Sequence, residues 1–251
     1  MVSICIPTYN QPQYVDRLIS SIKEQTYVDY EIIITDDSTD DEICNLIHNK
    51  YAGLGIKYEK NNKTLGAVRN CNEAIKRASG DLIKVMHQDD WFAEKNALEK
   101  MVSVMNQNKN ISLYSCNCYH VEDLFAYKRD FPISKLLEIN AKPMSLYMGN
   151  WIGAPSVTIF RNNGVIQDYK LRWLVDLDLY ITIMQGGGLF AFTDEPLVCI
   201  GLHNNQETIS CVNNKKLVRR EYLYLYKKYK LYKSNIKYTF RMLGCVLSGK
   251  D

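Results

Sequence analysis

Short runs of apolar and β-branched residues alternate with amphipathic segments along the first 110 residues. Four such runs are typical of buried strands: residues 2–6, 31–35, 56–59 and 82–86. Four segments carry apolar side chains at helical spacing: residues 12–25, 41–50, 66–79 and 94–107. We expect Pro7 to stop the first strand. The alternation predicts an α/β fold with a mostly parallel central sheet flanked by helices, which binds ligands at the carboxyl ends of its strands.

The pattern is looser after residue 110. Three further runs are strand-like, residues 111–118, 156–161 and 189–202, of which the last makes one strand or two. Helical patterns cover residues 176–185, 215–232 and 235–247, whereas residues 119–150 fit neither pattern. No run approaches the ~20 uninterrupted apolar residues of a membrane span. Met1 leads directly into a strand-like run, so we expect no signal peptide either.

Positive charge is concentrated near the C-terminal end. The formal net charge of the 251 residues is +3, but residues 215–241 contain ten Lys or Arg against one acid, so the rest of the chain is net acidic. Within this basic segment Tyr222, Leu225, Tyr226 and Tyr229 lie at i, i+3, i+4 and i+7, which predicts an apolar stripe beside a cationic face. Such a stripe suits docking on an anionic membrane surface or packing on the rest of the protein. Nucleic acid is not expected, because no known binding motif accompanies the charge.

The eight cysteines are expected to be reduced core residues. Most lie inside apolar runs, there is no Cys-x-x-Cys pair, and the four histidines are scattered without zinc spacing. Small buried thiols in a reducing cytosol explain this pattern. The length suits one large α/β domain, alone or with an appended segment.

Paired carboxylates follow two of the predicted strands. Asp36 and Asp37 end the second strand, and Asp89 and Asp90 follow the fourth. Adjacent carboxylates at the end of a buried strand are costly unless a cation lies between them, and a divalent ion is the usual candidate. A third acidic group lies at residues 176–178. Together these groups predict a metal-assisted reaction on an anionic, phosphorylated substrate.

Six motifs resemble those of family 2 glycosyltransferases with the GT-A fold. In chain order they are Val-Ser-Ile-Cys-Ile-Pro-Thr-Tyr-Asn at 2–10, Thr-Asp-Asp-Ser at 35–38, Asn-Lys-Thr-Leu-Gly-Ala-Val-Arg-Asn at 62–70, Gly-Asp-Leu at 80–82, Gln-Asp-Asp-Trp at 88–91 and Val-Asp-Leu-Asp-Leu at 175–179. Their order and spacing are family-like. The resemblance implies a Rossmann-like GT-A fold. It also implies an enzyme that transfers a hexosyl or N-acetylhexosaminyl group, with inversion, from a nucleotide diphosphate sugar to a hydroxyl; we expect a UDP-sugar.

The resemblance also implies a division of the chain. Residues 1–212 are expected to form the GT-A catalytic domain, with a nucleotide-binding half at 1–110 and an acceptor-binding half at 111–212. Residues 213–251 are then a basic, helical C-terminal tail.

The nucleotide is assigned by the resemblance to the first two strand ends. Asp37 is expected to accept a hydrogen bond from the imide N–H of uracil, a donor that thymine and guanine also offer, although a helix cap is the alternative role. Pro7 and Tyr9 are expected to line the base. Arg69 follows Gly66 at the start of a predicted helix and is expected either to reach the diphosphate or to lie in solvent.

Asp89 and Asp90 correspond to the metal-binding Asp-x-Asp region of the family. The resemblance implies Mn²⁺ or Mg²⁺ bound there against the two phosphates, because a cation neutralises the charge on the leaving diphosphate. His87 stands where many relatives have the leading Asp. We therefore expect Asp90 to ligate the ion and Asp89 to ligate it or to contact the ribose or the sugar. His87 is either a further ligand or a packed residue.

Asp176 matches the second residue of the Glu-Asp pair of the family and is the expected general base, which takes the proton of the acceptor hydroxyl. Val175 replaces the usual Glu, so Asp178 remains a rival. On a helix the two carboxylates point about 200° apart, so only one can face the pocket.

Acceptor contacts are expected from three residues besides Asp178. Trp151 and Trp173 flank the acidic group and are expected to stack on a sugar ring or to pack in the core. His203 falls where relatives have a loop that closes over the donor, and it is a candidate for contact with phosphate or metal.

The resemblance predicts a cytoplasmic enzyme, peripheral on the inner face of the plasma membrane. It would build a bacterial surface polysaccharide, such as O-antigen or capsule, on a glycan or lipid-linked oligosaccharide acceptor. One alternative is a sugar nucleotidyltransferase, although residues 7–10 are not the Gly-rich phosphate loop that it needs. The other is a non-catalytic nucleotide-binding subunit of a polysaccharide assembly complex, which His87 and Val175 in place of acids would favour.

Overall fold

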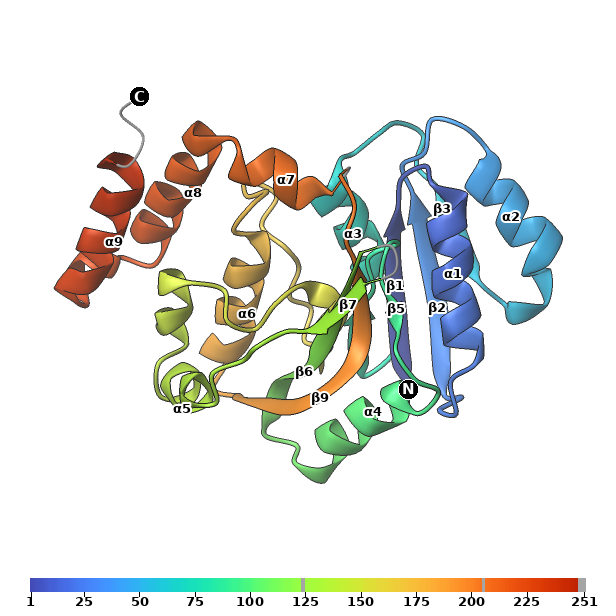
Figure 1. Cartoon of the computed structure of the whole chain (residues 1–251), viewed down its shortest axis with the longest axis horizontal. Helices are drawn as coiled ribbons and strands as arrows, with labels where there is room; N and C mark the ends of the chain where they lie inside the picture. The colour runs from blue at the N-terminus through green and yellow to red at the C-terminus, as the bar shows by residue number, and fades with distance from the viewer. Residues whose placement is uncertain (123–124, 205, 248–251) are drawn as a thin grey trace.

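The computed structural model describes residues 1–122, 125–204 and 206–247 (Figure 1). The strands are β1 (Val2–Thr8), β2 (Tyr30–Asp36), β3 (Lys57–Lys60), β4 (Leu82–Val85), β5 (Trp91–Phe92), β6 (Ile111–Glu122), β7 (Phe125–Lys128), β8 (Thr158–Arg161) and β9 (Leu189–Gly201). The α-helices are α1 (Pro12–Lys23), α2 (Glu42–Lys50), α3 (Ala67–Lys76), α4 (Ala97–Gln107), α5 (Ser134–Ala141), α6 (Val175–Gln185), α7 (Glu207–Val212), α8 (Lys215–Lys228) and α9 (Ile236–Leu247). Short 3₁₀ helices are η1 (Ala52–Leu54), η2 (Pro143–Met148), η3 (Pro155–Val157) and η4 (Leu231–Lys233).

These residues form one mixed sheet in the order β3-β2-β1-β4-β8-β6-β9-β5, with β7 paired to β6. The first four strands of this order run parallel to one another, and β9 runs parallel to β6. Strand β8 is antiparallel to β4 and β6, and β5 is antiparallel to β9. The expected α/β fold with a mostly parallel sheet is confirmed. Because β1, β2 and β4 are parallel, their carboxyl ends meet at one edge of the sheet, as the sequence predicted.

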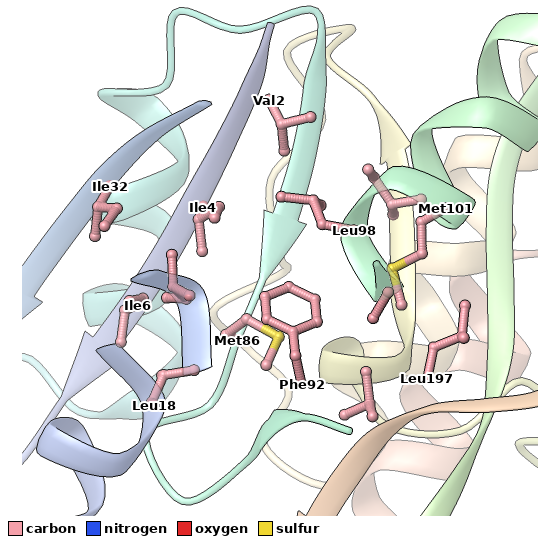
Figure 2. Packing of buried hydrophobic residues seen from close by; sticks show 14 of the residues in the cluster. Val2, Ile4, Ile6, Leu18, Ile32, Met86, Phe92, Leu98, Met101 and Leu197 are labelled. Carbon is pink, nitrogen blue, oxygen red and sulfur yellow. The ribbon is translucent and has the colours of Figure 1, made fainter. Parts of the chain in front are cut away.

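Each face of the sheet carries its own core, because alternate residues of a strand point to opposite faces. Val2, Ile4 and Ile6 of β1 pack on the side of α1 and α4, where Figure 2 shows them with Leu18, Phe92 and Met101. Cys5 points to the other side, where α3, α6 and α8 pack. All eight cysteines are free.

The predicted apolar stripe of the basic segment is buried inside the protein. Tyr222, Leu225 and Tyr226 of α8 are at most 9% exposed and belong to the same core as α6. The Tyr147 ring of η2 meets Tyr222 edge-on, with centroids 5.3 Å apart. Of the two interpretations of this stripe, the structure therefore bears out packing.

Pro7 does not stop the first strand, which continues to Thr8. The carbonyl of Cys5 accepts a hydrogen bond from Met86 N (3.0 Å), so odd-numbered residues of β1 turn toward β4. Strand β4 ends at Val85, opposite Cys5. The missing N–H of Pro7 therefore has no partner to lose, and the ring is tolerated.

Among the described strands and α-helices, β5, β7, α5 and α7 had no sequence assignment. All of these elements have eight residues or fewer, so they are too short to show a periodic pattern of apolar residues. The run at 189–202 is one strand whose register against β6 shifts between Cys116 and Asn117 and again between Asn117 and Cys118. In the described part of the chain, no helix is long and apolar enough to cross a membrane.

Candidate active site

The loops that follow β1, β2 and β4 are tied together by side-chain hydrogen bonds. Gln88 Oε1 accepts from Tyr9 N (2.9 Å), and Gln88 Nε2 donates to Tyr9 O (3.1 Å). Asn10 N donates to Ser38 Oγ (2.6 Å), which joins the first loop to the second. The Tyr9 side chain is left 48% exposed, and Pro7 is half-buried beside it in the chain. An aromatic ring therefore projects from a braced strand-end edge.

Asp36 and Asp37 have different roles: Asp36 joins strand ends, and Asp37 binds the loop before α3. The fully buried Asp36 accepts from Thr8 Oγ1 (3.0 Å), from Ser38 N (2.9 Å), from Ser38 Oγ (2.5 Å) and from the Tyr58 hydroxyl (2.7 Å). These bonds fill its acceptor positions and fix the ends of β1, β2 and β3 to one another.

Asp37 holds the loop that leads into α3. Its Oδ2 accepts from the backbone N–H groups of Leu65 (3.0 Å) and Gly66 (2.8 Å), and its Oδ1 accepts from Asn61 Nδ2 (2.7 Å). A carboxylate has about four acceptor positions, so Asp37 has roughly one left. It therefore braces the entrance of α3, not of α2 as a cap would.

Arg69 lies in the first turn of α3, and its guanidinium stacks over the Tyr169 ring with Cζ 4.6 Å from the ring centroid. Asn70, its neighbour, is buried and donates from Nδ2 to Thr8 O (2.9 Å). This bond ties the start of α3 to the end of β1, so Arg69 is carried on a fixed turn near the strand-end edge.

His87, Asp89 and Asp90 form a cluster directly after β4. One ligand atom from each of the three lies within 4.8 Å of the others. A turn brings them together, since Asp90 N donates to His87 O (3.1 Å). Burial and the nearby Asp89 raise the pKa of the Asp90 carboxyl well above its usual value, and burial lowers the pKa of His87.

The donor set of this cluster fits Mn²⁺ or Mg²⁺. Carboxylate oxygens suit both ions, and an imidazole nitrogen is a common ligand of transition metals. Burial and Asp89 outweigh the buried Lys84 in raising the pKa of Asp90, so a bound divalent cation would favour the ionised form of this carboxyl. The structure brings Asp89 and Asp90 together with His87, and their role as metal ligands stays a prediction.

The cluster is supported by residues that the sequence analysis did not select. Gly201 N, at the end of β9, donates to Asp90 Oδ1 (3.1 Å), and Ser156 Oγ accepts from His87 N (2.9 Å). Arg17 of α1 donates to Asp89 O (2.6 Å). These contacts join segments that lie 69 to 111 residues apart, so no local sequence signal could have revealed them.

His203 reaches the cluster from the loop after β9. Its Nε2 lies 2.9 Å from Asp89 Oδ2, and its ring lies 5.1 Å from that of Tyr14. The Arg17 guanidinium stacks over Trp91 at 3.7 Å from the ring centroid, directly after the two acids. The loop after β9 therefore contacts the carboxylate cluster through His203, and contact of His203 with phosphate or metal stays a prediction.

Asp176 and Asp178 lie in the first turn of α6 but have different surroundings. Among the described residues Asp176 makes no side-chain hydrogen bond or ion pair, and burial raises its pKa to about 7. Asp178 is 2% exposed, ion-paired to Lys228 (2.8 Å) and hydrogen-bonded to the Tyr229 hydroxyl (2.6 Å). In Figure 1 α6 runs down toward the start of β9, so its first turn lies toward the edge where β1 and β2 end.

The two tryptophans lie outside this hydrogen-bonded edge. Trp151 is 37% exposed in the loop before η3, with Lys135 Nζ 4.9 Å from its ring centroid. Trp173 packs its side chain against the core beneath α6, and its backbone N–H donates to Glu221. Of the two, Trp151 keeps the more exposed face.

Comparison with known proteins identifies the family. The model of glycosyl transferase family 2 matches residues 3–166. An uncharacterized glycosyltransferase of Haemophilus influenzae is 25% identical over 217 residues, which cover 84% of this chain and 71% of the relative. The Escherichia coli UDP-Glc:alpha-D-GlcNAc-diphosphoundecaprenol beta-1,3-glucosyltransferase WfgD is 36% identical over 113 residues, 45% of this chain and 43% of the enzyme.

Solved structures share the fold at low sequence identity. TarS 1-349 of S. aureus, in complex with UDP-GlcNAc, has a TM-score of 0.67 at 18% identity and covers 90% of this chain, which spans 66% of that structure. The mannosyltransferase PcManGT of Pyrobaculum calidifontis, in complex with GDP-Man and Mn²⁺, has a TM-score of 0.67 at 13% identity, with 90% of this chain and 64% of that chain covered. These matches place the chain in the GT-A fold.

Proposed function

The chain belongs to glycosyl transferase family 2, and from this we propose that it transfers a sugar from UDP to a hydroxyl of a glycan or lipid-linked acceptor, with inversion, in the synthesis of a surface polysaccharide. The observation that carries the proposal is the His87–Asp89–Asp90 cluster, braced at the edge where parallel strands end. UDP as the carrier is supported by two similar proteins: WfgD, which uses UDP-Glc, and TarS, which was solved with UDP-GlcNAc.

We assign the nucleotide to the braced loops after β1 and β2. The exposed ring of Tyr9, beside Pro7, offers a surface on which a base can stack. Asp37 keeps one acceptor position, enough for the single imide N–H of uracil. We assign the N–H groups of Arg69 to the diphosphate. The guanidinium of Arg69 can donate to the phosphates while it stays stacked on Tyr169 or after it has moved off this ring.

The divalent ion, Mn²⁺ or Mg²⁺, would be held by Asp90 and Asp89, with His87 as a further ligand. When bound, it neutralises the negative charge that develops on the departing diphosphate. The protein orients these ligands through Gly201 and Ser156, and His203 contacts the Asp89 carboxylate. The loop that carries His203 thereby links the metal ligands to the acceptor half.

We assign the general base to Asp176. An inverting displacement needs a carboxylate that accepts the proton of the acceptor hydroxyl as the new bond forms. Asp176 has no competing partner among the described residues, and its raised pKa of about 7 makes it a stronger base than an ordinary aspartate. Asp178 is engaged by Lys228 and Tyr229 and is unsuited to this role. Acceptor stacking falls to the exposed Trp151.

We infer that the protein lies against the anionic inner face of the plasma membrane, where lipid-linked acceptors are found, and that α9 provides the contact. Ile236, Phe240 and Leu243 are 67%, 66% and 40% exposed and share one side of α9. Lys230 and Lys233 are exposed just before this helix. An apolar face next to cations suits the surface of an anionic bilayer. We therefore assign the membrane contact to α9 and not to α8, because the apolar stripe of α8 is buried.

The proposal is tested by calorimetric titration of UDP, GDP and dTDP, each with and without Mn²⁺. We expect metal-dependent binding of UDP that is lost in Asp89→Ala/Asp90→Ala, with melting temperature compared to ensure that the variant is folded. Absence of binding by all three nucleotides would contradict the proposal.

Turnover separates transfer from the alternative activities. With a UDP-sugar as donor we expect release of UDP. Release of pyrophosphate in place of UDP would indicate a nucleotidyltransferase, and binding without release with any acceptor would indicate a non-catalytic subunit.

A further inference from the structure

Helix α8 contacts the start of α6 through a buried carboxylate. Glu221 is 1% exposed and accepts three successive backbone N–H groups, those of Arg172, Trp173 and Leu174, each at 2.9 Å. These residues directly precede α6, which begins at Val175. Three N–H groups that converge on one anion form a strong, charge-assisted arrangement, and an anion at this end also complements the helix dipole.

A second contact lies one turn into α6. Lys228 Nζ binds Asp178 Oδ2 (2.8 Å) and also Asp168 Oδ2 (2.9 Å), and the Tyr229 hydroxyl donates to Asp178 Oδ1 (2.6 Å). Tyr224 of α8 adds a hydrogen bond to Asp168 (2.7 Å). Both acceptor oxygens of the buried Asp178 are therefore held by α8 and the residue that follows it.

The two contacts share one face of α8 and bracket Asp176 on α6. Glu221 and Lys228 are seven residues apart, which is two helical turns, so both side chains point the same way. Along the chain the held positions are 172–174, just before α6, and 178 within α6, so they lie on either side of Asp176. Because residues two apart on a helix point about 200° away from each other, α8 holds Asp178 on roughly the opposite side of α6 from Asp176.

Asp176 itself is left to face other groups. Tyr180, one turn along α6, lies on the same side and donates from its hydroxyl to Gly153 O (3.0 Å). Residues of α6 pack in the same core as Cys71 of α3, and burial and the Asp176 carboxylate together raise the pKa of the Cys71 thiol. Rotation of α6 about its axis would move Asp176 away from this side, and the two contacts with α8 oppose that rotation.

We propose that α8 is a positioning element of the catalytic centre, in which Glu221 and Lys228 fix the start and the rotation of α6 so that Asp176 is presented to the acceptor hydroxyl. The inference rests on the proposed function, since it takes Asp176 as the base. In this proposal Glu221 and Lys228 act through α6 and not through contact with donor or acceptor. The basic segment at residues 215–241 thereby affects catalysis through the contacts of its helix α8 with the start of α6.

The test compares Glu221→Gln and Lys228→Met with Lys227→Met, which removes an exposed neighbouring cation from the same helix. We expect UDP–Mn²⁺ affinity by calorimetry and KM for the UDP-sugar to stay within about twofold in all three. We expect kcat, measured as UDP release, to fall at least tenfold in Glu221→Gln and Lys228→Met only, and Lys228→Arg to restore most of it.

A second readout does not depend on turnover. The ¹³Cγ resonance of Asp176, assigned with Asp176→Asn, should titrate near pH 7 in the wild type and in Lys227→Met and shift by at least half a pH unit in the two α8 variants. Tyr229→Phe, which removes one hydroxyl bond to Asp178, carries the same test if Lys228→Met does not fold.

The outcomes distinguish this inference from the proposed function. If the wild type releases no UDP from any UDP-sugar, the proposed function fails, whereas the titration of Asp176 still reports on α8. If the wild type turns over and the α8 variants match Lys227→Met in both kcat and Asp176 titration, α8 has no positioning role. Loss of UDP affinity in parallel with kcat would also overturn the inference, because the effect would then extend to the donor side.

Discussion

At the scale of single residues, the surroundings of a carboxylate separate groups that look alike in the sequence. Asp176 and Asp178 were rivals because the motif around Val175 departs from the family pattern, and helical geometry predicted only that they point apart. Tertiary contacts with Lys228, 50 residues later, distinguish them. In the same way Asp89 and Asp90 could be selected from their place after a strand, whereas Arg17 carries no motif.

The first prediction concerns Asp176→Asn and Asp178→Asn. We expect Asp176→Asn to retain UDP–Mn²⁺ binding while kcat falls about 10²- to 10⁴-fold, the usual contribution of a general base. Asp178→Asn should instead lower the free energy of unfolding by about 1–3 kcal/mol through loss of a charge-assisted bond. Kinetics and thermal melting measure the two effects. Retained transfer in Asp176→Asn with loss in Asp178→Asn would reverse the assignment.

The same group sets the pH dependence. Because burial raises the pKa of Asp176 to about 7, the base is protonated and inactive below that pH, and kcat should fall about tenfold per unit as pH drops below 7. The raised pKa also means that the folded protein is destabilised by ionisation as pH rises from about 4 to 7. Asp176→Asn should therefore melt higher than the wild type at pH 8 and lose this advantage near pH 4, as calorimetry can measure.

At the scale of elements, periodicity located those long enough to show it. The strands and helices of the first 110 residues came from apolar spacing, apart from β5, whose two residues have no period and are defined by their pairing with β9. Residues 119–150 could not be assigned because β7, α5 and η2 are short and held by packing against longer elements. The division of the chain at residue 212 stays a prediction.

Strand β9 leads to a prediction at Gly201. A Cβ at this position would collide with the Asp89 carbonyl and crowd the Arg17 guanidinium, so the loop with the proposed metal ligands would have to move. We expect Gly201→Ala to weaken Mn²⁺-dependent UDP binding roughly tenfold, about 1.4 kcal/mol. Gly53→Ala is the matched control, since a Cβ there meets nothing within 4 Å. Equal affinity in both variants would show that the loop tolerates the displacement.

At the scale of the whole molecule, the family resemblance predicted the GT-A fold and the edge of the sheet where the site lies. The sequence could not predict how the basic segment sits, because one apolar stripe serves equally for a membrane and for a core. Figure 1 shows α8 and α9 at the end of the molecule away from β1, β2 and β3. Their inner side faces α6, and the exposed face of α9 is the part left for a partner.

Membrane binding is therefore predicted through α9. Wild-type protein should co-float with vesicles that contain phosphatidylglycerol more than with phosphatidylcholine vesicles, and high salt should weaken binding because it screens the lysines. Ile236→Ser/Phe240→Ser should reduce flotation several-fold. Val28→Ser, which removes an apolar side chain that is 82% exposed elsewhere, is the control. Equal flotation of the two variants would exclude α9 as the contact.

The support of Asp90 by Gly201 has a consequence for how the protein is made. The ribosome synthesises residues 87–90 long before Ser156 and Gly201, and Gly201 lies 111 positions later. Strand β9 then inserts between β6 and β5. A nascent chain that ends at residue 110 still lacks two groups that hold its acidic turn, so we expect the proposed metal and donor sites to mature late in translation. We therefore expect the proposed transfer activity to appear only after residue 201 has been synthesised.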